Sequence, residues 1–362
     1  MKHLLVILCL TVSAAAQNAG MRPAVSAAPV KSRVVVLENP AIINNFRVND
    51  TLLADSFNRA LLALANQAAV SDAWRQFVTP RDVVAIHITT TGGQVLSTHR
   101  ALLDAVISGL QAAGVAKRNI TVWDKFASDL QAAGYNANAF RCQAVIPGAG
   151  FTPDQFYFSE IAGQLIWGDH DFRGKTKPDD FLAPDTLEIS ATATKPAEPP
   201  QVSNRSYYTT LLTKRATKII NLPVMSSDER IGLAGCVSSL ALASVDNTRR
   251  FLNSSSTAAE AIAEIYASDI IKPKTVLHIM DGTLAQYAGG PYFIPNYCAQ
   301  PGLLYLSRDP VAIDTLALER IEAWRKTKAI DPVGKDAAHL RQAAQLGIGA
   351  NEKSQMEIIN LR

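Results

Sequence analysis

Short apolar runs alternate along the chain with longer segments whose apolar residues recur three or four apart. The runs at 33–39 (RVVVLEN) and 82–88 (DVVAIHI) are compact and rich in β-branched residues, as expected for buried strands. The segment between them predicts an amphipathic helix, with Asn49, Asp50 or Thr51 as its amino-terminal cap. Its inward-facing residues are Leu53, Phe57, Ala60, Leu61 and Leu64.

The same alternation continues toward the carboxyl terminus, except at residues 150–205. Further strands are predicted at 119–125, 141–148, 218–223, 275–282, 302–307 and 355–361. Further helices are predicted at 97–114, 127–135, 236–243, 256–267, 309–327 and 335–349, with Asp309 and Pro310 opening the helix at 309–327. Strands separated by such helices form right-handed βαβ units, so we expect an α/β fold with a mostly parallel sheet and flanking helices.

Residues 150–205 are interpreted as an insertion that is partly extended and partly irregular. The stretch 155–172 (QFYFSEIAGQLIWGDHDF) is typical of a hairpin, and the residues after it are rich in Pro, Thr and Ala without a period. Asp169 and Asp171 flank His170 and resemble a pair of hard-metal ligands. The tip of a hairpin explains the same three residues, so the metal stays unknown.

The first residues, MKHLLVILCLTVSAAAQ, have the three parts of a secretory signal peptide: a basic start at Lys2, an apolar core, and small residues before a cleavage near Ala16. We therefore expect residues 1–16 to be removed, 17–32 to be a linker, and 33–362 to be the α/β domain of an exported protein, periplasmic or extracellular. The apolar core is shorter than the ~20 residues that cross a bilayer, so no membrane anchor is expected.

Composition narrows the range of partners and cofactors. The formal net charge is +3 without a run of like charges, so a nucleic-acid partner is not indicated. Cys142, Cys236 and Cys298 remain once the signal is removed, and an odd number allows at most one intramolecular disulfide. No CxxC motif is present, so an iron–sulfur cluster is not expected; buried, inert thiols are.

Polar residues follow several of the predicted strands. In an open parallel sheet, ligands gather beyond the carboxyl ends of the strands, so these residues form the candidate site. They are Thr89–Gly93, Asp124, Lys125, Ser226, Ser227, Asp228, Arg230, Asp281, Gly282, Ser307, Arg308 and Asp309.

The loop TTTGG at 89–93 is the best local candidate for an anion cradle. Gly92 and Gly93 would let backbone N–H groups approach a phosphate or carboxylate, and Thr90 would add a hydroxyl donor. No GK[ST] follows, so the loop is not a P-loop, and an ordinary strand-to-helix turn explains it equally. His99 stands near the start of the next helix, either facing the same crevice or facing solvent.

Carboxylates supply the candidate catalytic groups. Asp124 beside Lys125 is either an acid–base pair or a surface ion pair worth less than about 1 kcal/mol. Asp281 is either a carboxylate displayed on a turn or part of an ordinary Asp-Gly turn, and Asp228 follows the strand at 218–223. In VDNTRRF, Arg250 is either an anion-binding guanidinium or one of two surface charges.

Several blocks in order resemble the domain of unknown function 362 family: STHRALLDAVISGLQAAG, WDKFASDLQAAGY, ATKIINLPV, SVDNTRRF, IAEIYA, VLHIMDGTLAQYAGGP and LSRDPVAIDTLALE. They cover nearly the whole mature chain outside the insertion. The resemblance implies a two-lobed α/β fold, without a settled reaction. Some members carry a ferredoxin-type module, which this chain lacks.

The chain departs from that family at three charged positions. Many members have Lys-Pro-Asn or Lys-Ile-Asn where this chain has His87-Ile88-Thr89, and Leu-Lys-Asp-His where it has Ser226, Ser227 and Asp228 after Met225. A further Lys-Asn pair falls at Ser238-Ser239. Serine supplies neither the positive charge nor the proton affinity of lysine.

Two hypotheses follow. In the first, the protein is an exported enzyme, or is derived from one, and acts on a small anionic molecule with Asp124, Lys125, Asp228 and Asp281. Thr90, Gly92, Gly93, His99 and Arg250 would then orient the anion. In the second, the same crevice binds a small molecule without catalysis, which the missing lysines favour. The sequence leaves any cofactor unknown.

Overall fold

The structure is a computed structural model of the 362-residue chain, and it describes residues 31–135, 142–146, 150–165 and 202–362. Residues 31–362 form one compact unit. The predicted signal peptide, most of the linker and the possible metal pair at Asp169 and Asp171 lie outside the described residues. No described helix is long and apolar enough to cross a membrane.

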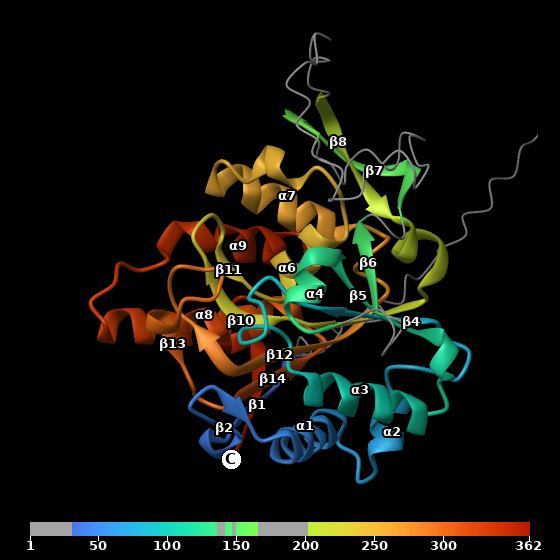
Figure 1. Ribbon diagram of the computed structural model, residues 1–362, viewed down its shortest axis with the longest axis vertical. Coiled ribbons are helices and arrows are strands. Elements are labelled where there is room, and N and C mark those ends of the chain that lie inside the picture. The colour runs from blue at the N-terminus through green and yellow to red at the C-terminus, as the bar shows by residue number, and fades with distance from the viewer. Residues whose placement is uncertain (1–30, 136–141, 147–149, 166–201) are drawn as a thin grey trace, which may run out of the picture. The chain divides into compact units, whose positions relative to one another are not determined.

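A central sheet organises this unit (Figure 1). Its main path runs β15 (Met356–Leu361), β1 (Ser32–Glu38), β14 (Leu303–Ser307), β12 (Thr275–Gln286), β9 (Lys218–Leu222), β4 (Val84–Ile88), β5 (Ile120–Phe126) and β6 (Cys142–Ile146). Neighbours along this path are parallel except at β14, which is antiparallel to both β1 and β12. The predicted α/β fold with a mostly parallel sheet is therefore confirmed.

Shorter strands extend the sheet or pair outside it. β10 (Val224–Asp228) and β13 (Cys298–Ala299) pair with the central strand β12, and β11 (Gly232–Ala234) pairs with β10. Outside this sheet, β2 (Ile43–Asn44) pairs with β3 (Arg47–Val48), and β7 (Phe151–Gln164) pairs with β8 (Val202–Thr209). The last pair corrects the predicted hairpin at 155–172, because the partner of β7 comes from beyond residue 201.

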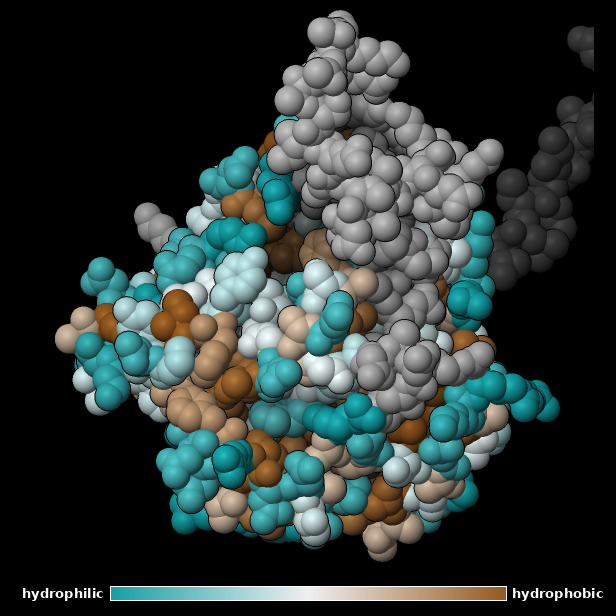
Figure 2. Space-filling view, viewed as in Figure 1, coloured by the Kyte–Doolittle hydropathy of each residue, from teal (hydrophilic) through white to brown (hydrophobic). Residues whose placement is uncertain are grey.

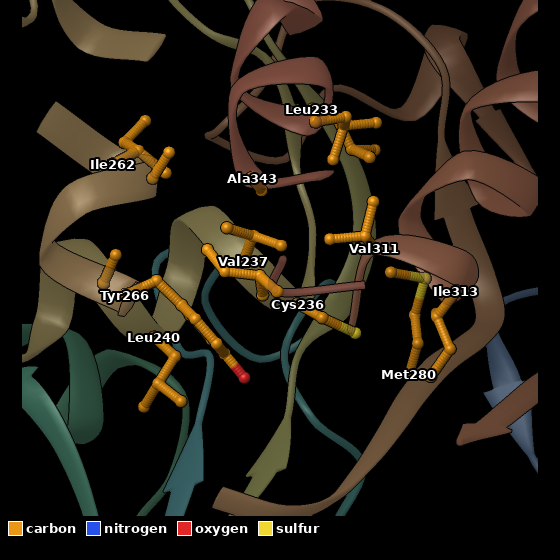
Figure 3. Packing of buried hydrophobic residues seen from close by; sticks show 14 of the residues in the cluster. Leu233, Cys236, Val237, Leu240, Ile262, Tyr266, Met280, Val311, Ile313 and Ala343 are labelled. Carbon is orange, nitrogen blue, oxygen red and sulfur yellow. The ribbon is translucent and has the colours of Figure 1, made fainter. Parts of the chain in front are cut away.

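Helices cover both faces of the sheet, as the near-continuous apolar strands require. One hydrophobic cluster packs α1 (Asp50–Ala65), α2 (Val70–Arg75) and α3 (Arg100–Ala112) against one face. The other packs α6 (Cys236–Ala243), α7 (Ser255–Ala267), α8 (Pro310–Thr327) and α9 (Ala338–Gln345) against the opposite face. Along β1, Val34 and Val36 join the second cluster and Val35 and Leu37 the first, as strand alternation dictates. Figure 3 shows the second cluster around Cys236, Val237 and Tyr266.

Helix ends agree with the capping signals in the sequence. The Asn49 side chain accepts from the backbone N–H of Leu52 at the start of α1, and the predicted inward residues of that helix are buried. Asp309 caps α8 by accepting from Ala312 N, with Pro310 at the first position. α4 (Ala127–Ala132) follows β5, and short helical turns lie at η1 (Pro40–Ile42), η2 (Lys117–Asn119), η6 (Leu211–Arg215), η7 (Thr248–Phe251), η8 (Pro295–Tyr297), η9 (Gly334–Ala337) and η10 (Lys353–Gln355).

Three expected strand ends differ in the structure. Pro223 interrupts β9, yet the chain continues as β10, so Ser226, Ser227 and Asp228 lie within a strand and not in a loop. β12 continues to Gln286, which places Asp281 and Gly282 inside it. Because β14 is antiparallel to β12, Ser307–Asp309 lie at the opposite edge of the sheet from the carboxyl ends of the parallel strands.

Candidate functional site

A pocket of about 360 Å³ opens at the carboxyl ends of β4 and β5 and beside β10, the edge at which the sequence placed a site. On the face shown in Figure 2, hydrophilic and hydrophobic residues are interspersed. The pocket has the same mixed character. Its polar lining residues are His87, Thr89, Thr91, Asp124, Lys125, Ser128, Asp129, Ser226, Asp228, Arg230, Ser238, Ser239, Asn247, Thr248 and Arg249. Its apolar lining includes Leu96, Phe126, Ile231, Leu242, Leu252 and Tyr292.

Asp124 is the most perturbed acid of the pocket. Its Oδ2 accepts from the backbone N–H of Thr90 at 2.9 Å and from the Thr90 hydroxyl, and its Oδ1 accepts from Lys125 N at 2.6 Å. Burial outweighs these hydrogen bonds and raises the pKa of Asp124 to about 6. The carboxyl group can therefore change its protonation state near neutral pH.

Lys125 places an ammonium group at the wall of the pocket. Its Nζ donates to the carbonyl oxygen of Leu242 at 3.3 Å and to the hydroxyl of Thr248 at 3.2 Å, and it lies 5.6 Å from the centre of the Phe126 ring. The residue is 8% exposed. These contacts hold the charge in one place between β5, α6 and η7.

Asp228 lines the pocket as half of an ion pair. Arg230 Nη2 donates to its Oδ2 at 2.9 Å, and the backbone N–H of Arg230 donates to its Oδ1 at 2.8 Å. The hydrogen bond to Asp228 raises the pKa of Arg230. Asp228 is 4% exposed. Because its negative charge is paired with the positive charge of Arg230, the two residues together bring no net charge to the pocket.

Asp281 and His99 are brought together, but neither lines this pocket. Asp281 Oδ2 accepts from the backbone N–H of His99 at 2.9 Å and lies 2.8 Å from His99 Nδ1, while Oδ1 accepts from the Thr283 hydroxyl at 2.6 Å. Burial alone would raise the pKa of Asp281, but the His99 charge and these hydrogen bonds lower it. Burial likewise opposes the charge on His99, and Asp281 overcomes it and raises the pKa of His99.

Within the TTTGG loop, both expected anion donors of Thr90 are already used by the protein. Thr90 is fully buried and gives both its N–H and its hydroxyl to Asp124, whereas Thr89 and Thr91 line the pocket. Gly92 lines it too, and a Cβ there would lie 2.0 Å from Leu96 O. Close backbone approach thus explains the glycine at 92, and Gly93 does not line the pocket.

Arg250 has a different position from the one expected. It is 4% exposed and donates to the carbonyl oxygen of Ile161 at 2.7 Å and to the Ser206 hydroxyl at 3.0 Å. These bonds tie η7 to the β7–β8 ribbon and leave Arg250 outside the pocket. Its neighbour Arg249 is exposed and lines the pocket, and its side chain has no hydrogen bond or ion pair to another described residue.

His87 lines the pocket and was not selected from the sequence as a site residue. Its Nδ1 lies 2.7 Å from Asn221 Oδ1, and its Nε2 lies 3.8 Å from Asp124 Oδ1. Asn221 Nδ2 lies 3.2 Å from His278 Nδ1, and His278 Nε2 lies 2.9 Å from the Tyr266 hydroxyl oxygen. The signal in the sequence is a polar residue inside an apolar stretch of each of three strands, and strand pairing aligns them: His87 with Asn221, and Asn221 with His278.

Two further polar atoms of pocket-lining residues have no hydrogen-bond partner in the described part of the chain. They are Thr89 Oγ1 and Ser239 Oγ, both buried. A buried hydroxyl group without a partner is costly, so a ligand or water that bonds these atoms would be stabilised.

Metal ligands do not gather in the described residues, which contain no group of three or more His, Cys, Asp or Glu side chains suited to a metal ion. Cys236 and Cys298 are free thiols. Burial raises the pKa of Cys236 well above its usual value and that of Cys298 to about 11, so both are unreactive.

Comparison with known proteins shows a similarity to one family. No curated protein matches the chain. A crystal structure of a Thermotoga maritima protein, a structural-genomics target, matches with 9% identity and a TM-score of 0.35 over 79% of this chain, which spans 60% of the length of that protein. The model of the family described as Domain of unknown function (DUF362) matches residues 192–319. This segment holds β8 to β14 and the first half of α8. Residues 192–319 are thus similar to the DUF362 family, in agreement with the resemblance of the sequence blocks from ATKIINLPV onward.

Proposed function

We propose that this protein binds a small anionic molecule in the pocket at the carboxyl ends of β4 and β5. Two cationic side chains of the pocket support this. The Lys125 ammonium group donates to a carbonyl and to a hydroxyl oxygen, and the Arg249 side chain has no hydrogen bond or ion pair to another described residue. Arg230 is neutralised by Asp228 and contributes no net charge. The unpartnered Arg249 guanidinium is the observation on which the proposal rests, since a guanidinium binds carboxylates and phosphates through two parallel hydrogen bonds.

We further propose that the protein is an enzyme or is derived from one, with Asp124 as its acid–base group. A general acid or base works best when its pKa lies near the working pH, and burial raises the pKa of Asp124 to about 6. Asp124 also lines the pocket, where it would lie beside the bound anion. A proton passed to or from the ligand would then be held at an Asp124 carboxyl oxygen.

The alternative is a binding protein without catalysis. One observation favours it: Ser238 and Ser239 line the pocket where the family resemblance has a Lys-Asn pair. An assay on the wild-type protein separates the two, since a catalyst turns over a ligand that a binding protein returns unchanged.

An exported location belongs to the same proposal. The amino-terminal sequence supports it, with cleavage near Ala16. Expression of the full chain followed by mass spectrometry of the mature protein tests this, because an intact Met1 in exported protein would contradict it.

Calorimetric titration tests the anion site. Inorganic phosphate, n-propyl phosphate and acetate are titrated into wild type, Arg249→Gln and Lys125→Met at pH 7.5. Loss of a charged hydrogen bond is worth about 1.5–3 kcal/mol, so either variant should weaken binding by about tenfold or more. Arg81→Gln is the matched control, because Arg81 is exposed at the opposite, amino end of β4. If none of the three anions binds wild type, the proposal is wrong.

A further inference from the structure

The hydrogen bonds of Asn221 fix which nitrogen of His87 carries a proton. The amide group of Asn221 lies 2.9 Å from the carbonyl oxygen of Cys236, which can only accept. The Asn221 Nδ2 must therefore face Cys236, and its Oδ1 must face His87. Because that oxygen only accepts, His87 Nδ1 must be the protonated nitrogen, and His87 Nε2 carries a lone pair.

The same row of hydrogen bonds extends beyond Asn221 to two further side chains. Asn221 Nδ2 also lies 3.2 Å from His278 Nδ1, which must accept, so His278 Nε2 donates to the Tyr266 hydroxyl oxygen at 2.9 Å. All four side chains are at most 2% exposed. Each N–H group of the His87, Asn221 and His278 side chains has an acceptor in this buried row, so His87 has no alternative tautomer without breaking several bonds.

His87 lines the pocket, and its Nε2 lies on the side of Asp124, another lining residue. The nearest polar atom recorded for it in the described residues is Asp124 Oδ1 at 3.8 Å, beyond hydrogen-bond distance. Burial lowers the pKa of His87 to about 4, so the ring is neutral and accepts at pH 7. His87 Nε2 and Asp124 Oδ1 therefore form a corner with two acceptors and, among the described residues, no donor that bridges them, in the pocket that Lys125 and Arg249 also line.

We infer that this corner selects, among small anions, those that also carry a hydroxyl group, with His87 Nε2 accepting the hydroxyl hydrogen. The inference rests on the proposed anion site and names its ligand class. The hydroxyl oxygen would in turn accept from Asp124 when that carboxyl group is protonated. His87 and Asp124 contact the ligand, whereas Asn221 and His278 are positioning residues that hold the tautomer. An anion without the hydroxyl leaves the His87 nitrogen unpaired in a buried site, which costs affinity.

Two probes of equal charge and chain length test the selection by calorimetry: sn-glycerol 3-phosphate and n-propyl phosphate. Wild type should bind the hydroxylated probe about tenfold more tightly. His87→Phe keeps a flat ring without the acceptor and should lose this preference while still binding n-propyl phosphate. His339→Phe is the matched control, because His339 is buried in α9 and neither ring nitrogen has a partner in the described residues.

The outcomes separate the two proposals. Equal affinity of wild type for both probes overturns the hydroxyl selection and leaves the anion site standing. Binding of neither probe overturns the anion site and this inference together. A preference that survives in His87→Phe assigns the selection to another residue and overturns the role of His87.

A ligand-free measurement keeps the inference testable even if His87→Phe does not fold. Two-bond proton–nitrogen correlations on ¹⁵N-histidine-labelled wild type at pH 7 should show His87 neutral and protonated at Nδ1. In Asn221→Leu the Nε2-protonated form should appear, a change that a purely structural role of Asn221 would not produce. A protonated Nε2 in wild type would overturn the inference.

Discussion

Two buried aspartates near the same edge of the sheet have opposite electrostatic surroundings. Asp124 lies on the pocket, with hydrogen-bond donors but a net cost of burial, and its pKa is raised to about 6. Asp281 lies off the pocket against His99, and its pKa is lowered. A carboxylate paired with a cation and two hydrogen-bond donors stabilises the fold. A carboxyl group held near its titration point, facing a cavity, is available for a ligand.

Removing Asp281 should have the largest effect on stability. Asp281→Ala leaves the backbone N–H of His99 and the Thr283 hydroxyl without their acceptor and a histidine without its counter-charge. Breaking a buried pair in this way costs about 3–5 kcal/mol in the free energy of unfolding. Urea unfolding at pH 6 measures it, and a loss below about 1 kcal/mol would contradict the stabilising role assigned to the pair.

The second largest expected effect is on the pH dependence of the free energy of unfolding, to which the two aspartates contribute in opposite directions. Asp124 has a folded pKa above its usual value of 3.8, so the folded state binds more protons, and its contribution is lost as the pH rises from about 4 to about 6. Asp281 has a lowered folded pKa, so its contribution is present above pH 4 and is lost as the pH falls through the folded value. His99 has a raised folded pKa, so its contribution is lost as the pH rises above 6.5.

Variants assign these slopes. Asp124→Asn should flatten the unfolding free energy between pH 4 and 6, and Asp281→Asn should remove the rise that begins at lower pH. The same profile in wild type and Asp124→Asn would mean that the pKa of Asp124 is not raised.

Paired threonine substitutions should have a smaller effect. Thr283→Val removes a hydroxyl donor to Asp281, and Thr90→Val removes one to Asp124. Each loses a hydrogen bond to a charged group, worth about 1.5–3 kcal/mol when the carboxylate is ionised. Below pH 5 the cost of Thr90→Val should shrink, since Asp124 is then largely protonated, whereas that of Thr283→Val should persist. Equal pH dependence in the two variants would remove the distinction.

The smallest effect is expected at the surface. Arg100 and Asp104 form an exposed i,i+4 pair on α3, with Nε 3.3 Å from Oδ2. Asp104→Asn should change the free energy of unfolding by less than about 1 kcal/mol. Thermal unfolding measures this change. A larger loss of stability would contradict the expectation that exposed ion pairs stabilise the fold less than buried ones.

The sequence predicted the layers of this fold better than its strand directions. Apolar periodicity was sufficient for α1, α3, α7 and α8, because each buries one face against the sheet. It did not reveal that β14 is antiparallel, since a strand covered on both faces is apolar in either direction. Ser307 and Asp309 were therefore assigned to the wrong edge.

The location of the candidate site in the sheet was predictable from the sequence, but the residues that line the pocket were predicted only in part. Asp124, Lys125 and Asp228 do line the pocket, because each lies near the carboxyl end of a strand or of its continuation. Asp281 and Arg250 do not, since β12 continues past residue 281 and the β7–β8 ribbon encloses Arg250. The role of His87 depends on its pairing with Asn221 across two neighbouring strands, and the spacing of the two residues along the sequence does not predict that pairing.

The central claim is that Asp124 faces a ligand site and Asp281 does not. A ¹³C titration of aspartate carboxyl groups measures both, with assignments from Asp124→Asn and Asp281→Asn. It is run with and without 1-propanesulfonate, which stays anionic throughout the titration. An anion beside Asp124 should raise its pKa further from about 6 and leave the pKa of Asp281 below 3.8. An unchanged pKa of Asp124 at saturating sulfonate, or an equal shift at both aspartates, would contradict the account.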